Sequence, residues 1–168
     1  MVVEVGEQAG YFSIPDQNGN TIRLSAFPGK RVVLSFHPLA WTRICAEQMK
    51  ALEANRETFD ALDAVALGIS VDSVPPCKRA WAGGSLGIKK TRLLADFWPH
   101  GAVAQMYGVF DSQKGYSRRA NVVVDEVGGR IIFVAEYTAT TVPDMQDVLD
   151  ALRVPEKSRR AEERAPEI

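Results

Sequence analysis

The chain has 168 residues, of which 46% are hydrophobic and 24% are charged, a length and composition that fit one globular domain. Its 20 Lys and Arg residues stand against 21 Asp and Glu residues, so the formal net charge is −1. This balance excludes the broad cationic surface of a nucleic-acid binder or a polybasic membrane binder. Two cysteines are too few for a disulfide scaffold or a four-cysteine zinc site.

The first half of the chain predicts a hairpin, two strands and a helix. Their expected bounds are 13–15 and 21–24 for the hairpin, 31–36 and 65–71 for the strands, and about 43–62 for the helix. The Asn18-Gly19 pair between two alternating segments is a strong signal for the hairpin. Met49 and Leu52 begin a series of apolar residues at helical spacing, and Thr42 stands at the N-cap of this helix.

The second half continues the alternation and ends in a hairpin and a helix. We expect a helix from Pro75-Pro76 to Gly83-Gly84, a strand at 93–95, a helix at 102–107, a hairpin at 121–125 and 130–137, and a last helix from Pro143. This order predicts an α/β fold, with a mixed central sheet flanked by helices and an N-terminal β-hairpin. One domain is expected over 1–154, followed by a charged, flexible tail over 155–168.

The N-terminal residues carry no signal for export. Glu4, Glu7 and Asp16 interrupt this part of the chain, which therefore has no continuous apolar segment of the signal-peptide type. The longest apolar runs, such as 131–135, have the length of a strand and not of a membrane span. We therefore expect a cytoplasmic protein, in a reducing compartment where thiols stay free unless chemistry uses them.

Pro38, Thr42 and Cys45 form the segment with the clearest chemistry. If Thr42 caps the following helix, Cys45 falls in its first turn, where free N–H groups and the positive end of the helix dipole favour a thiolate. The Thr42 hydroxyl would then be near the sulfur and able to donate to an anion or a bound oxygen. A buried cysteine that acts only as a small apolar residue is the alternative, and the local pattern leaves both open.

This segment contains the complete pattern Pro-x-x-x-Thr/Ser-x-x-Cys and resembles the signature of the peroxiredoxins. Further segments that resemble this family lie at 13–19, 96–101, 106–110 and 119–125. The Phe-Trp-Pro-His-Gly stretch at 97–101 is most similar to the alkyl hydroperoxide reductase E subgroup. The resemblance implies a thioredoxin-like fold and a cysteine-dependent peroxidase.

The resemblance also implies a role for each candidate residue. The Cys45 thiolate would attack the terminal oxygen of a peroxide and become a sulfenic acid, with release of water or an alcohol. Arg119 matches the active-site arginine of the family; Arg118 is the competing candidate, which we interpret as a surface charge. Thr42, Arg119 and the Cys45 backbone N–H would stabilise charge on the leaving oxygen, and Pro38 would exclude water.

The implied substrates are hydrogen peroxide, alkyl hydroperoxides and peroxynitrite, and the implied reductant is a thioredoxin- or glutaredoxin-type protein. Because sulfur itself carries the redox change, no metal, flavin or haem cofactor is expected. The resemblance implies a homodimer or higher homo-oligomer, without a nucleic-acid or membrane partner.

The sequence allows two interpretations of Cys77 and two of His37. Cys77 lies 32 residues after Cys45 on a separate predicted helix, so the two thiols would meet only after local unfolding. It is either a resolving cysteine or a packing residue beside Trp81. His37 stands where the family usually has Tyr or Phe, and it either supplies positive charge near the thiolate or packs as a neutral side chain.

Two other functions compete with a peroxidase. The first is a metal site built from Cys45, Cys77, His37 and His100, whose spacings match no short ligand-pair pattern. The second is a peroxide-responsive redox sensor or chaperone, which would use the same oxidation of Cys45 without efficient turnover.

Overall fold

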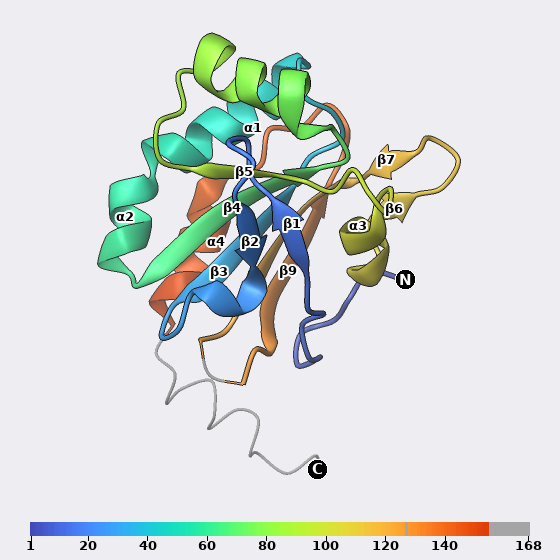
Figure 1. The fold of residues 1–168 in the computed structure, drawn as a ribbon. Helices are drawn as coiled ribbons and strands as arrows, with labels where there is room; N and C mark the ends of the chain where they lie inside the picture. Colours follow the sequence, from blue (N-terminus) through green and yellow to red (C-terminus); the bar gives the residue numbers. More distant parts are fainter. Residues whose placement is uncertain (127, 155–168) are drawn as a thin grey trace.

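The structure is a computed structural model that describes residues 1–126 and 128–154, so the predicted tail over 155–168 lies outside the described residues. Its centre is a five-stranded sheet in the order β5-β4-β3-β8-β9 (Figure 1). The strands are β3 (Arg31–Phe36), β4 (Ala64–Ser70), β5 (Arg92–Ala95), β8 (Arg119–Val124) and β9 (Ile131–Tyr137). β3, β4 and β5 run parallel, whereas β8 is antiparallel to both β3 and β9. The mixed sheet of the predicted α/β class is confirmed.

Side chains of the central strands alternate between two apolar layers. Val32, Leu34 and Phe36 of β3 pack with the hairpin β1 (Ser13–Pro15) and β2 (Thr21–Arg23) and with α3 (Ala102–Met106). Val33 faces the opposite layer, which contains α1 (Arg43–Ala54), α2 (Arg56–Ala61) and α4 (Met145–Arg153). Figure 1 shows the β1–β2 hairpin in front of the sheet and α4 behind it. Because successive strand residues face opposite sides, odd-numbered residues of β3 point toward α1.

The single helix predicted over about 43–62 is wrong, because the chain breaks between α1 and α2 at Asn55. This residue has φ −97° and ψ 7°. Its side-chain amide donates to the Ala51 carbonyl at 2.8 Å, and its backbone N–H donates to the same carbonyl at 3.2 Å. The apolar series continues across the break, which is why the helical spacing did not reveal it.

The predicted helix from Pro75 to Gly84 is also wrong in type. The segment forms two irregular π-helical turns, η2 (Val74–Lys78) and η3 (Ala80–Ser85). Pro75 has φ −101° and ψ 140°, outside the helical region. A residue that precedes proline is disfavoured in the α conformation, and Pro75 precedes Pro76. The second proline therefore prevents a regular first turn.

A short hairpin that the sequence did not predict joins α3 to β8. Its strands are β6 (Phe110–Asp111) and β7 (Tyr116–Ser117). Asp111 Oδ1 accepts the backbone N–H groups of Gln113 and Lys114 at 3.0 and 3.2 Å, which fixes the turn. The last predicted helix is confirmed but starts after Asp144, whose side chain accepts the Gln146 N–H and caps α4.

Gly68 of β4 sets how closely α1 approaches the sheet. A Cβ atom there would lie 2.3 Å from Met49 Sδ and 2.7 Å from Leu93 Cδ2. We expect Gly68→Ala to lower the free energy of unfolding by about 1–3 kcal/mol through overpacking, as measured by urea unfolding.

Gly83→Ala is the matched control, because nothing lies within 4 Å of a Cβ at that exposed position. It should change the free energy of unfolding by no more than about 0.5 kcal/mol. Equal effects of the two substitutions would contradict close packing at Gly68.

Candidate active site

Cys45 is the third residue of α1 and is 1% exposed. Thr42 precedes the helix in an extended conformation, with φ −105° and ψ 147°, so it occupies the predicted N-cap position. It forms no side-chain cap, however, and its hydroxyl donates to the Leu39 carbonyl at 2.8 Å. Because its hydrogen bonds to the Leu39 carbonyl, Thr42 Oγ1 can interact with a ligand only through its lone pairs. In this conformation Thr42 Oγ1 is therefore placed to accept a hydrogen bond from a ligand.

One pocket of about 440 Å³ brings the four predicted site residues together. Pro38, Thr42 and Cys45 come from the segment between β3 and α1, and Arg119 comes from the start of β8. The other lining residues are Leu39, Arg43, Ile44, Asp111, Lys114, Tyr116, Ser117, Arg118, Tyr137, Thr138 and Ala139. The walls thus include the β6–β7 hairpin and the end of β9, which the sequence did not connect with the site.

The Arg119 guanidinium lies against the Cys45 thiol inside this pocket. Nη1 is 3.4 Å from Cys45 Sγ and donates to Gln48 Oε1 at 2.7 Å, while Nη2 donates to the Ala139 carbonyl at 2.9 Å. Arg119 is 3% exposed, so its charge acts in a medium of low dielectric. These contacts fix the plane of the guanidinium next to the sulfur.

Arg118 also lines the pocket but bonds elsewhere. Its Nε lies 2.9 Å from Glu136 Oε1 in an exposed ion pair, and its Nη2 donates to the Gly108 carbonyl at 2.7 Å. Strand alternation explains the difference between the two arginines, because Arg119 shares its face of β8 with Asn121 and Val123, toward α1.

Gln48 is a buried polar residue that sequence reasoning missed. It lies on the apolar face of α1, and its Nε2 donates to Ser35 Oγ at 2.7 Å and to the Phe36 carbonyl at 3.1 Å. Ser35 Oγ in turn donates to Asn121 Oδ1 at 2.7 Å. This network orients Gln48 Oε1 toward Arg119. A glutamine three residues after the cysteine, on a face that is otherwise apolar, was the signal available in the sequence.

His37 is fully buried next to Trp81, with ring centroids 5.5 Å apart. Neither ring nitrogen has a hydrogen-bond partner among the residues that the structure describes. Burial, together with the positive charges of Lys78 and Arg119, holds the pKa of His37 well below 6.5. The ring is therefore neutral at pH 7, which favours the packed histidine over a source of positive charge.

Cys77 and His100 lie away from the pocket. Both cysteines are free thiols, and Cys77 is partly buried on η2 without lining the pocket of Cys45. His100 Nε2 lies 2.7 Å from the Gly115 carbonyl oxygen on the surface. The four residues of the metal hypothesis do not converge, and no three His, Cys, Asp or Glu side chains in residues 1–126 and 128–154 form a metal-binding group.

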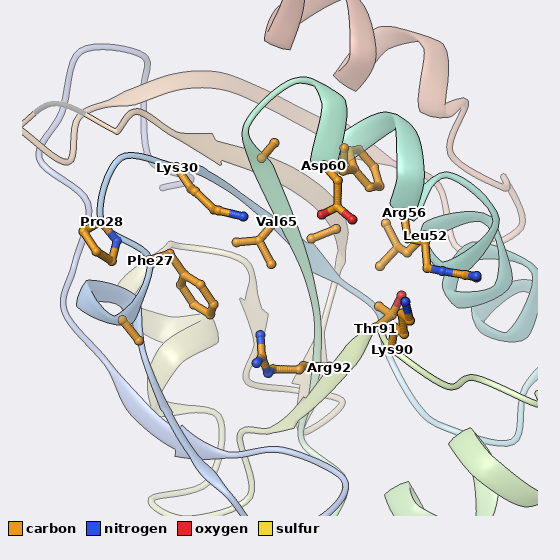
Figure 2. A pocket seen from close by; sticks show the side chains of 14 residues that line it. Phe27, Pro28, Lys30, Leu52, Arg56, Asp60, Val65, Lys90, Thr91 and Arg92 are labelled. Atoms are coloured by element: carbon orange, nitrogen blue, oxygen red, sulfur yellow. The ribbon is translucent and has the colours of Figure 1, made fainter.

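A second pocket, of about 540 Å³, lies beside α2, β4 and β5 (Figure 2). Its rim includes Lys30, Arg56, Lys90 and Arg92, and the Arg92 guanidinium carbon lies 5.5 Å from the centroid of the Phe27 ring. All its lining residues are described, and none is a cysteine or histidine. Across the described part of the chain, no helix has the length and apolar character needed to span a membrane.

The buried His37 predicts a loss of stability in acid. The unfolded chain binds a proton at this residue below about pH 6.5, whereas the folded chain, with its lowered pKa, does not. The free energy of unfolding therefore falls as the pH falls below about 6.5, and His37 contributes at most about 1.4 kcal/mol per pH unit to this decrease.

We expect His37→Phe to remove this dependence, as measured by urea unfolding at pH 7.5, 6 and 5. The wild-type and variant free energies should run parallel above pH 7 and diverge below pH 6.5. Parallel curves down to pH 5 would contradict a buried neutral histidine.

Comparisons with known proteins agree with this geometry. The AhpC/TSA family matches residues 5–131. The chain is 43% identical over 128 residues to alkyl hydroperoxide reductase E of Mycobacterium tuberculosis, covering 76% of this chain and 82% of that protein. It is 31% identical over 159 residues to peroxiredoxin-2 of Mus musculus, covering 90% of this chain and 77% of that protein.

Among solved structures, the reduced 2-Cys peroxiredoxin of Plasmodium vivax has a TM-score of 0.81 at 24% identity, covering 96% of this chain and 85% of that one. This likeness shows the thioredoxin-like fold, as the sequence predicted. Since the family match and the identity both extend over most of the sequence, the chain belongs to the AhpC/TSA family, as a peroxiredoxin of the alkyl hydroperoxide reductase E type.

Proposed function

We propose that Cys45 is the peroxidatic cysteine of this thiol-dependent peroxidase, and that its substrates are hydrogen peroxide, alkyl hydroperoxides and peroxynitrite. The contact of Arg119 Nη1 with Cys45 Sγ, at 3.4 Å in a pocket that Thr42 and Pro38 also line, carries the proposal. The thiolate attacks the terminal oxygen, the O–O bond breaks, and an S–O bond forms. The leaving oxygen departs as hydroxide or alkoxide and takes a proton to become water or an alcohol, or it departs within nitrite when peroxynitrite is the substrate, while Cys45 becomes a sulfenic acid.

Ionisation of a thiol is too small an effect to explain such a reaction. A cysteine with a pKa of about 8.5 is already about 3% thiolate at pH 7, so full ionisation gains about thirtyfold, or roughly 2 kcal/mol. Part of that gain is lost because nucleophilicity falls with pKa, at a Brønsted slope of about 0.4–0.5. The larger contribution must come from groups oriented toward the charge that develops on the leaving oxygen.

Arg119 is suited to that task because Gln48 and Ala139 already hold its guanidinium in place. Its orientation needs no rearrangement as charge moves from sulfur to oxygen. Thr42 Oγ1, which donates to Leu39, accepts the O–H of the incoming hydroperoxide and directs its terminal oxygen at Cys45. Pro38 excludes water from the same pocket, which strengthens these interactions.

The catalytic cycle closes when a thiol reduces the oxidised Cys45. We propose a thioredoxin- or glutaredoxin-type protein in the cytoplasm as the reductant, either directly or after Cys77 forms a disulfide. A homodimer or higher homo-oligomer is supported by three exposed aromatic side chains, Trp41, Phe97 and Trp98, of which Trp98 is 80% exposed. No metal or organic cofactor enters this cycle, because the sulfur of Cys45 exchanges the electrons.

Thr42→Val tests the arrangement around the peroxide. We expect kcat/KM for hydrogen peroxide to fall by about 10²-fold, the usual scale for loss of one oriented polar group, while thiolate absorbance is unchanged. Stopped-flow fluorescence and ultraviolet titration measure the two quantities. Thr42→Ser keeps the hydroxyl and should retain most activity, and Cys45→Ser should be inactive.

Equal activity of Thr42→Val and wild type would contradict the role of Thr42. A wild-type protein that oxidises once with peroxide and does not turn over with a recycling thiol would instead indicate a redox sensor.

The role of Cys77 is tested by non-reducing mass spectrometry after treatment with one equivalent of peroxide. A resolving cysteine should give a Cys45–Cys77 disulfide in the wild type and a lasting Cys45 sulfenic acid in Cys77→Ser. A lasting sulfenic acid or a mixed disulfide in the wild type would show that an external thiol resolves Cys45 directly.

A further inference from the structure

The pocket of about 540 Å³ beside α2, β4 and β5 shares no lining residue with the pocket of Cys45 (Figure 2). It exists because the edge strand β5 is short at this end of the sheet. The β4–β5 ladder begins at Leu67 and Arg92, whereas β4 itself begins at Ala64, so β5 leaves the first three residues of β4 uncovered. The pocket therefore lies at the amino-terminal ends of β4 and β5, while Cys45 follows the carboxyl end of β3.

The walls of this pocket combine an apolar floor with an excess of positive charge. Its charged lining residues are four basic ones and one acidic one, namely Lys30, Arg56, Lys90, Arg92 and Asp60. The formal charge of the lining is thus +3, although that of the whole chain is −1. The larger apolar side chains of the lining are those of Phe27, Leu52, Phe59 and Val65. Such a combination suits an anion that carries an apolar body.

Three of the four cations have no carboxylate partner in the described part of the chain. Arg56 Nη1 lies 3.4 Å from Glu53 Oε1, whereas Lys30, Lys90 and Arg92 form no ion pair within residues 1–126 and 128–154. Arg92 instead lies over an aromatic ring, that of Phe27. Because like charges repel one another, an anion bound among these cations is attracted by several of them at once.

Hydrogen bonds hold the backbone that carries two of these cations. Glu53 accepts three consecutive N–H groups, those of residues 89–91, at 3.1, 3.2 and 2.8 Å. Gln17, in the turn between β1 and β2, donates to the Thr91 carbonyl at 2.9 Å and accepts the Leu93 N–H at 2.8 Å. The basic side chains of this stretch therefore start from a fixed backbone, which lowers the entropic cost of ordering them around a ligand.

We propose that this pocket binds an organic phosphate of the nucleotide type, a ligand that joins at least two phosphate charges to a planar heteroaromatic ring. Lys30 and Lys90 bind the phosphate oxygens, and the ring lies against the stacked pair of Phe27 and Arg92. The Asp60 carboxylate accepts a hydrogen bond from an amino or hydroxyl group of the ligand.

Two properties of the pocket favour this class of ligand. Several unpaired cations match a ligand with two or more negative charges better than a single carboxylate, and the apolar floor favours an organic ligand over a bare ion. The volume of about 540 Å³ also lies in the range of roughly 300–1,000 Å³ that small-molecule sites occupy. The inference is independent of the chemistry proposed for Cys45, because the two pockets have no residue in common.

Isothermal titration calorimetry of the intact, reduced protein with ADP tests the site. We expect ADP to bind with a Kd below about 1 mM in 50 mM NaCl, and several-fold more weakly in 300 mM NaCl because salt screens the cations. Inorganic pyrophosphate lacks the ring and adenosine lacks the phosphates. Each should therefore bind at least about tenfold more weakly than ADP.

Lys30→Gln and Arg92→Gln should each weaken ADP binding about tenfold, the scale of one hydrogen bond to a charged group. Lys89→Gln is the matched control, because Lys89 is exposed and adjacent to Lys90 but does not line the pocket. It should change the Kd by no more than about twofold. Lys30 and Arg92 are exposed as well, so all three variants should keep the urea midpoint of the wild type.

Arg43→Gln removes a cation from the wall of the Cys45 pocket and should leave ADP binding unchanged. Four results would overturn the proposal. They are no binding of ADP at about 1 mM, equal weakening by Lys89→Gln and the two pocket variants, loss of ADP binding in Arg43→Gln, and equal Kd values for pyrophosphate and ADP. None of them bears on peroxide reduction, which is measured separately by turnover of the same wild-type protein.

Discussion

The contact between the Arg119 guanidinium and the Cys45 thiol, 3.4 Å from Nη1 to Sγ, is the interaction on which the rest of the site depends. Both side chains are almost fully buried, so water screens their interaction weakly. Burial would also make an unbonded guanidinium costly, and hydrogen bonds to Gln48 and Ala139 offset that cost. The fold thus presents the sulfur with a cation that is already oriented.

The same layer of the protein contains two more basic side chains, and burial affects them differently. His37 avoids charge altogether, since its pKa is held well below 6.5. Desolvation by burial lowers the pKa of Lys78 to about 7, and the negative groups Asp72, Cys45 and Asp96 oppose part of that shift. Burial therefore opposes positive charge on both side chains, more completely on His37 than on Lys78. Such a cluster is costly for stability, and costs of this kind concentrate at functional sites.

Local signals predicted the elements whose conformation depends on neighbours in sequence. Asn18-Gly19 specified the first hairpin, and Asp144 provides the capping oxygen that begins α4. The two predicted helices that were wrong each contain a residue whose backbone leaves the helical region. The backbone leaves helical geometry at Asn55, which ends α1, and Pro75, which precedes a second proline, lies outside the helical region. Both residues are visible in the sequence, but the spacing of apolar residues, from which the helices were predicted, does not depend on them.

The sequence by itself determined the α/β class, the family resemblance and the position of Cys45 in the first turn of a helix, because these depend on short patterns. Only the tertiary structure decided which groups meet the sulfur. Strand pairing selected Arg119 over Arg118 by the face each occupies, and it brought Gln48 against the guanidinium. Burial likewise lowered the pKa of Lys78 to about 7. Charge, exposure and contact between distant residues are properties of packing, and no local pattern records them.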